Sequence, residues 1–121
     1  PELHYGRDAL VGVALFLTQL AERKISVKQL RESYPNYFIS KNKIQLTPEI
    51  DVDKILSNLE QKYQNEQITT IDGLKIDFEE GWVHLRKSNT EPIIRIYAES
   101  EGEEKATAFA QKMINEIKEL I

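Results

Sequence analysis

The residues best suited to chemistry stand close together in the last third of the chain. They are two arginines, two hydroxyl residues and an asparagine: Arg86, Ser88, Asn89, Thr90 and Arg95. Arginine donates two parallel hydrogen bonds to phosphate oxygens and never loses its proton. The hydroxyls add donors, and Asn89 tolerates a left-handed backbone in which successive N–H groups face an anion. The segment therefore predicts a phosphate-binding loop.

Strand periodicity predicts how this loop is held. Successive side chains of a strand point to opposite faces, which places both arginines on the outer face of two paired strands. With residues 87–92 as the loop, Arg86 lies opposite Ile93. By the same register, His84 lies opposite Arg95. The two arginines then become diagonal neighbours about 7–8 Å apart at the backbone, and their side chains can converge on one ligand.

The loop also has a plainer interpretation. Pro92 forces Glu91 into an extended conformation that ends the loop. Glu91 would repel phosphate if it pointed inward, so we expect it to brace the loop. Serine, asparagine, threonine and proline are common in solvated hairpin turns, and the alternative is a simple exposed loop with two arginines.

The elements before the loop divide into two groups. Asp8 can cap a helix over residues 9–22 that has almost no polar face. Such a helix should be buried on most sides, so we expect it to come from a larger body and to promote self-association of this chain. Ser26 with Gln29 resembles a capping box for a short helix that ends near Ser33.

The remaining pattern predicts an α+β domain, an antiparallel sheet with two helices packed on one face. Asp72-Gly73 favours a type I′ hairpin, and Ser100 with Glu103 resembles a second capping box. The expected strands are 37–46, 67–71, 74–78, 82–86 and 93–99, with one helix from the Asp51 cap to about Gln64 and another from the second capping box to the end.

Composition narrows the function. The 121 residues carry a net charge of −4, which argues against a general nucleic-acid binder. The absence of cysteine excludes disulfides, thiolate catalysis and cysteine-ligated zinc, and the two histidines make no convincing metal site. The longest apolar stretch is shorter than the ~20 residues that span a bilayer, so no membrane segment is indicated. We expect a cytoplasmic protein.

The segment from Gly81 to Arg95, GWVHLRKSNTEPIIR, resembles the C-terminal signature of the α-D-phosphohexomutases, the phosphoglucomutase/phosphomannomutase superfamily. The match is long and ordered, which makes it specific. In that family the loop lies on a fourth domain, a sheet with helices on one side that is related in fold to the TATA-binding-protein class. The resemblance implies this fold for residues 35–121 and identifies residues 1–34 as the helical tail of the preceding, third domain.

Members of that family move a phosphoryl group between the 1- and 6-positions of a hexose phosphate, through a phosphoserine, a magnesium ion and a bisphosphorylated sugar. The resemblance implies that the five residues named first bind the substrate phosphate that is not transferred. It also implies that Glu91 and Arg7 support the sugar or the loop. The Ser-Asn-Thr form of the loop is more similar to the phosphomannomutase and phosphoglucomutase branches than to the phosphoglucosamine mutases.

The family's phosphoserine, metal and sugar-selecting loops have no equivalent in this sequence. We therefore expect a fragment that has no catalytic residue, metal ligand or cofactor of its own, with Mg²⁺ in the full-length enzyme. Its expected partners are a hexose phosphate or bisphosphate and the missing N-terminal domains of the same chain. The alternative is a non-enzymatic module in which the same cations bind a nucleic-acid backbone or an acidic protein.

Overall fold

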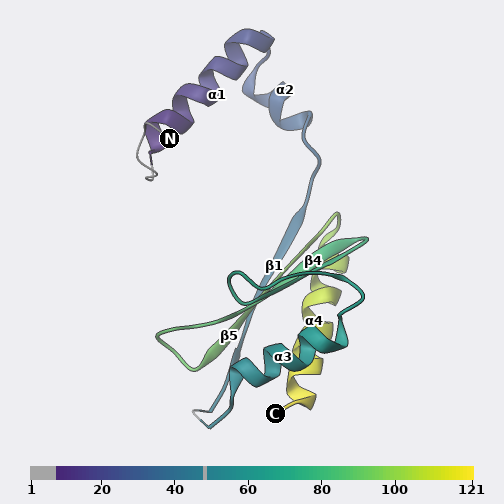
Figure 1. Cartoon of the computed structure of the whole chain (residues 1–121). Coiled ribbons are helices and arrows are strands. Elements are labelled where there is room, and N and C mark those ends of the chain that lie inside the picture. Colours follow the sequence, from purple (N-terminus) through teal and green to yellow (C-terminus); the bar gives the residue numbers. More distant parts are fainter. Residues whose placement is uncertain (1–7, 48) are drawn as a thin grey trace. The chain divides into compact units, whose positions relative to one another are not determined.

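The computed structural model describes residues 8–47 and 49–121. The chain divides into two units, one that ends at Pro35 and one that runs from Asn36 to Ile121 (Figure 1).

The first unit contains two helices, α1 (Ala9–Arg23) and α2 (Val27–Glu32). The Asp8 carboxylate accepts hydrogen bonds from the first backbone N–H groups of α1, as predicted. Lys24 ends α1 in a left-handed conformation with φ of 53°. The predicted capping box at α2 is confirmed, since Ser26 and Gln29 each bond the other's backbone.

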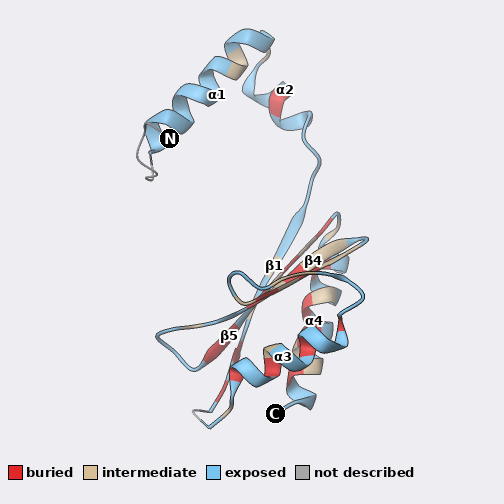
Figure 2. Cartoon of the chain, viewed as in Figure 1, coloured by how far each residue is buried: buried red, intermediate tan, exposed pale blue. Residues whose placement is uncertain are grey.

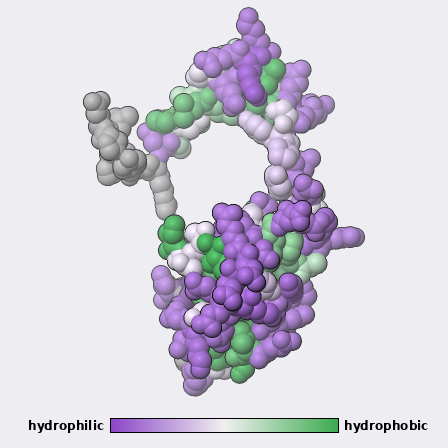
Figure 3. All heavy atoms as spheres, turned by 45° about the vertical axis from the view of Figure 1, so that its right-hand side comes forward, coloured by the Kyte–Doolittle hydropathy of each residue, from purple (hydrophilic) through white to green (hydrophobic). Residues whose placement is uncertain are grey.

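Helix α1 has no buried residue. Leu10 is 81% exposed and Leu15 is 67% exposed, and Figure 2 shows nearly all of α1 in the colour of exposed residues. Figure 3 likewise shows hydrophobic side chains at the surface of this unit. Within the first unit, α2 thus leaves uncovered most of the apolar surface of α1 that the sequence pattern predicts to be buried.

The second unit is a five-stranded antiparallel sheet with strand order β1-β5-β4-β3-β2. Two helices, α3 and α4, lie on one face of it (Figure 1), which confirms the predicted α+β class. The element bounds are β1 (Phe38–Gln45), α3 (Val52–Lys62), β2 (Gln67–Thr69), β3 (Leu74–Phe78), β4 (Gly81–Lys87), β5 (Ile93–Ser100) and α4 (Glu103–Glu119).

The core lies between the helices and the inner face of the sheet. It contains the apolar side chains that alternate along the strands and recur at helical spacing on α3 and α4: Ile44, Leu46, Val52, Ile55, Leu59, Tyr63, Leu74, Ile76, Val83, Leu85, Ile94, Ile96, Ala98, Ala110, Met113 and Ile117. This core leaves the opposite face of the sheet without a covering helix in the second unit, and both arginines lie on that outer face.

Tyr63 joins three elements in the core. Its hydroxyl donates a 2.6 Å hydrogen bond to Oε1 of Glu116 on α4. Its ring meets that of Phe78 edge-on, and Phe78 stacks on Phe109. Burial raises the pKa of Tyr63 above its usual range, and the Glu116 carboxylate raises it further.

Two local predictions are wrong. The predicted capping box of Ser100 with Glu103 is absent, and helix α4 begins after Gly102 with no side-chain cap. Ser100 is instead the last residue of β5, and its hydroxyl donates a 2.6 Å hydrogen bond to the Glu80 carbonyl. The turn before β3 is not type I′, which needs positive φ at two central residues. Gly73 has φ of 81°, but Lys24 is the only non-glycine residue with positive φ in the described chain.

Candidate functional site

The two arginines of the predicted site lie directly opposite each other. Arg86 on β4 pairs with Arg95 on β5, and His84 pairs with Tyr97. The predicted register was therefore wrong by two residues, because β4 continues to Lys87 and shortens the connecting loop. A shift of two residues preserves the alternation of side chains, so the predicted outer face for both arginines is still correct.

Backbone hydrogen bonds close the loop of residues 88–92. The Ser88 N–H donates to the Ile93 carbonyl at 3.1 Å, and the Ile93 N–H donates to the Glu91 carbonyl at 2.8 Å. The Leu46 N–H donates to the Pro92 carbonyl at 2.8 Å, which ties the loop to the end of β1. The loop is thus anchored at both its base and its side.

The loop side chains are accessible. Asn89, Thr90 and Glu91 are exposed, and Ser88 is half-buried. Asn89 does not adopt the left-handed conformation predicted for it, since it is not among the described residues with positive φ. The donors that this loop conformation offers to an anion are therefore mainly hydroxyl and amide side chains rather than a left-handed backbone nest.

Arg86 contacts the loop that connects β2 to β3. Its Nε lies 3.2 Å from Oδ1 of Asp72. Nε2 of His84 lies 2.5 Å from the backbone carbonyl oxygen of the same aspartate. Gly73, next in the chain, passes so close to the Leu85 carbonyl that a Cβ would collide with it. Asp72 is consequently held beside the outer face of β4.

Arg95 lies in a different environment, a shallow hollow of about 350 Å³ at β1 and β5. Lys41, Lys43, Glu91 and Tyr97 also line this hollow. The two lysines were not among the predicted site residues, although strand alternation places them on the face opposite Ile44 and could have identified them.

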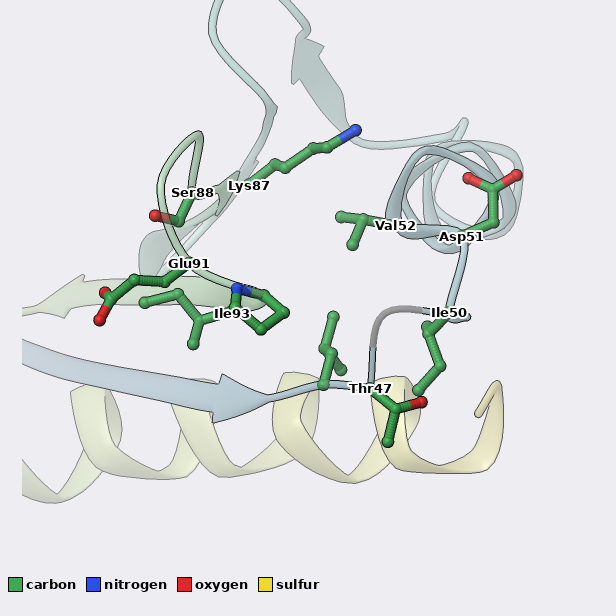
Figure 4. A pocket seen from close by; sticks show the side chains of 10 residues that line it. Thr47, Ile50, Asp51, Val52, Lys87, Ser88, Glu91 and Ile93 are labelled. Carbon is green, nitrogen blue, oxygen red and sulfur yellow. The ribbon is translucent and has the colours of Figure 1, made fainter.

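A second hollow, of about 250 Å³, lies on the other side of the loop (Figure 4). Ser88 and Glu91 line it together with residues at the start of α3. The Lys87 side chain extends toward α3, where its Nζ lies 2.7 Å from Oδ2 of Asp53. Glu91 thus lines both hollows, whereas Ser88 and Arg95 line one each.

Trp82, which belongs to the segment that carries the family resemblance, has a structural partner. Trp82 donates its indole N–H to Glu99 at 2.9 Å, across the β4–β5 pair. Arg7 lies outside the described residues. Residues 8–47 and 49–121 contain no group of three or more His, Asp or Glu side chains that could hold a metal ion. No helix in those ranges is long and apolar enough to cross a membrane.

Comparisons with known proteins agree with the fold and identify the family. Residues 21–116 match the family model described as "Phosphoglucomutase/phosphomannomutase, C-terminal domain". A phosphoglucosamine/phosphogalactosamine mutase of Sulfurisphaera tokodaii is 36% identical over all of this chain and 26% of its own length. A phosphoglucomutase/phosphomannomutase of Thermococcus kodakarensis is 33% identical, with the same coverage.

A solved structure has the same fold. It is a phosphoglucomutase/phosphomannomutase family protein from Burkholderia thailandensis, which superposes with a TM-score of 0.63 at 23% identity over 94% of this chain and 24% of that one. The chain spans about a quarter of the length of the curated relatives named here. The family match shows that this chain belongs to the phosphoglucomutase/phosphomannomutase family, whose C-terminal domain corresponds to residues 21–116.

Proposed function

We propose that this domain binds the phosphate group of a hexose phosphate that is not transferred during a phosphohexomutase reaction. The observation that carries the proposal is the direct pairing of Arg86 with Arg95 on the open face of the sheet, next to an exposed loop of hydroxyl and amide side chains. Two guanidinium groups at neighbouring positions supply the charge and the forked donors that a phosphate dianion needs.

Each proposed ligand residue has a part in this binding. Arg86 and Arg95 provide charge-assisted hydrogen bonds, and Ser88, Asn89 and Thr90 provide neutral ones. The Glu91 carboxylate, which lines the same hollow as Arg95, accepts a hydrogen bond from a hydroxyl of the sugar. The backbone bonds that close the loop keep these donors in place before the ligand arrives, which lowers the entropy cost of binding.

The chemical step takes place elsewhere in the full-length enzyme. A phosphoserine and a Mg²⁺ ion in other domains of the same chain transfer the phosphoryl group between the two ends of the sugar. This domain holds the far end of the substrate, through its phosphate, and closes over it to exclude water from the transfer. The isolated chain binds a hexose phosphate or bisphosphate without converting it.

An amide NMR titration of this chain with glucose 1,6-bisphosphate tests the proposal. We expect the largest shifts for residues 86–95, with smaller changes on α3 and α4, which pack against the opposite face. An oligonucleotide serves as the comparison ligand because a nucleic-acid module would use the same cations. Shifts of residues 86–95 with the oligonucleotide alone would overturn the proposal.

A further inference from the structure

The hollow at β1 and β5 has a concentration of positive charge that the phosphate loop does not explain. Lys41, Lys43 and Arg95 line it, and Glu91 is the only carboxylate that lines it with them. All three cations have exposed side chains. The hollow lies on the outer face of the sheet, because its strand residues alternate with the buried Ile44, Ile94 and Ile96.

Strand pairing brings these cations together. Lys43 is directly opposite Arg95, and Lys41 is directly opposite Tyr97. Neighbouring strands lie about 4.7–4.9 Å apart, so the paired side chains rise from adjacent positions. Because Arg95 is also directly opposite Arg86, three cations stand in one row across β1, β5 and β4.

The row is only partly neutralised by the protein. Like charges directly opposite each other destabilise a sheet. Within the row, Arg86 has Asp72 as a partner. Two lysines outside the row also have carboxylate partners, since Lys87 pairs with Asp53 and Lys75 pairs with Asp77. By contrast, neither Lys43 nor Arg95 has a side-chain hydrogen bond or ion pair with any residue in 8–47 or 49–121. An anion in the hollow would relieve this repulsion.

We propose that Lys41, Lys43 and Arg95 form a second anion subsite that takes the phosphate-monoester dianion of a sugar phosphate. Tyr97 also lines the hollow, with Lys41 Nζ over its ring at 6.0 Å from the centroid, and supplies apolar ring surface beside the sugar. Arg95 is shared with the loop site, whereas the two lysines belong to the new subsite alone. The proposal therefore does not depend on whether residues 88–90 bind phosphate.

The charge pattern selects a small ligand rather than a polyanion. The next row of the outer face, beyond Tyr97, carries Glu99 opposite Trp82, and Trp82 is opposite Asp77. A nucleic-acid backbone that crossed the sheet would meet these two carboxylates. The cationic area is thus bounded on one side by acidic residues, and its volume suits a single phosphorylated sugar.

Amide NMR titration of the whole chain at low salt with glucose 1-phosphate tests this subsite. For the wild-type chain we expect chemical-shift changes at residues 41–43 and 95–97. In a K41Q/K43Q double variant, the affinity for glucose 1-phosphate measured at these residues should fall at least about tenfold, because charge-assisted contacts are lost. The matched control is Lys54→Gln, an exposed lysine on α3 on the opposite side of the sheet, which should not change that affinity. Thermal unfolding of each variant checks that the fold is retained.

Three results would overturn the subsite: unchanged affinity in the double variant, shifts confined to residues 88–91, or the same shifts from sodium chloride at equal ionic strength. The loop is tested separately with Ser88→Ala. If this variant loses the shifts at 88–91 but keeps those at 41–43, both sites are present and distinct. If the wild-type chain shows shifts at 41–43 but none at 88–91, the loop proposal fails and the subsite stands.

Discussion

Oδ1 of Asp72 lies 3.2 Å from Nε of Arg86, so the loop between β2 and β3 contacts the first arginine of the proposed phosphate site. Both side chains are more than half exposed, at 60% and 53%. An exposed ion pair of this kind contributes about 0–1 kcal/mol to stability. The ion pair matters more for binding than for stability, because a phosphate must compete with the Asp72 carboxylate for the Arg86 guanidinium.

We expect Asp72→Asn to raise the affinity for glucose 1,6-bisphosphate by up to about fivefold, the equivalent of an exposed ion pair. Removal of the carboxylate releases Arg86 and removes a nearby negative charge. Isothermal titration calorimetry of this chain measures the change. Asp53→Asn is the control, because it removes a similar pair with Lys87 at α3. A loss of affinity in Asp72→Asn would show that the aspartate positions Arg86 for binding instead.

Arg86→Ala and Arg95→Ala should each weaken hexose-phosphate binding by about 1.5–3 kcal/mol, the usual contribution of a charge-assisted hydrogen bond. Both side chains are exposed on the outer face, so the fold should be unaffected. In the full-length enzyme the same changes should lower kcat/KM for the sugar phosphate. Lys118→Ala, an exposed cation in the last turn of α4, should leave both quantities unchanged. Unfolding of either arginine variant would contradict the assignment of these side chains to the open face.

Tyr63→Phe should destabilise the second unit by about 1.5–3 kcal/mol near pH 7, because it removes a hydrogen bond to the charged Glu116. Urea unfolding followed by circular dichroism measures this loss. Phe109→Leu is a useful comparison, since it changes the same aromatic cluster without a polar group.

The buried Tyr63 hydroxyl should also make the stability of the fold depend on pH. Burial raises the pKa of Tyr63 in the folded chain, whereas the unfolded chain releases this proton near the usual value of about 10. Above about pH 10 the folded state then holds more protons than the unfolded state. The contribution of Tyr63 to the free energy of unfolding is therefore complete below about pH 10 and declines as the pH rises above it. Stability of the wild-type chain should fall more steeply above pH 10 than that of Tyr63→Phe. Parallel curves for the two proteins would refute this.

Helix α1 should make the chain self-associate. Its exposed apolar side chains, which include Leu10 and Leu15, form a surface that soluble monomers seldom leave uncovered. Sedimentation velocity should show association that increases with concentration, and Leu15→Glu should suppress it. Glu22→Gln, on the same helix but outside the apolar surface, is the control. A wild-type chain that stays monomeric at all concentrations would leave only the alternative that α1 folds back on its own chain.

Much of the fold was predictable because its signals are local. Asp8, Ser26 and Asp51 begin helices since each side chain accepts a hydrogen bond from a backbone N–H within three residues. Val83 and Leu85 are buried in the core, as alternation along β4 requires, because every second side chain of a strand lies on the same face. The same rule correctly predicted that both arginines of the site lie on the other face.

What the sequence could not decide depends on contacts between distant segments. Ser100 carries a capping signal, but it lies inside β5 and bonds Glu80, which is near only because the strands pair. The pairing of Arg86 with Arg95 follows from how far β4 extends before the chain turns, and a register that differs by two residues satisfies the alternation equally well.

The pair Lys43 and Arg95 shows the same difference between what local sequence decides and what distant contacts decide. Local alternation is sufficient to place each side chain on an outer face. Their approach across β1 and β5 requires the sheet order, which brings the first strand beside the last. Sequence therefore specified which residues are cationic and which face they share, whereas only the tertiary structure made them neighbours, because the pairing of β1 with β5 joins residues 48 to 62 positions apart.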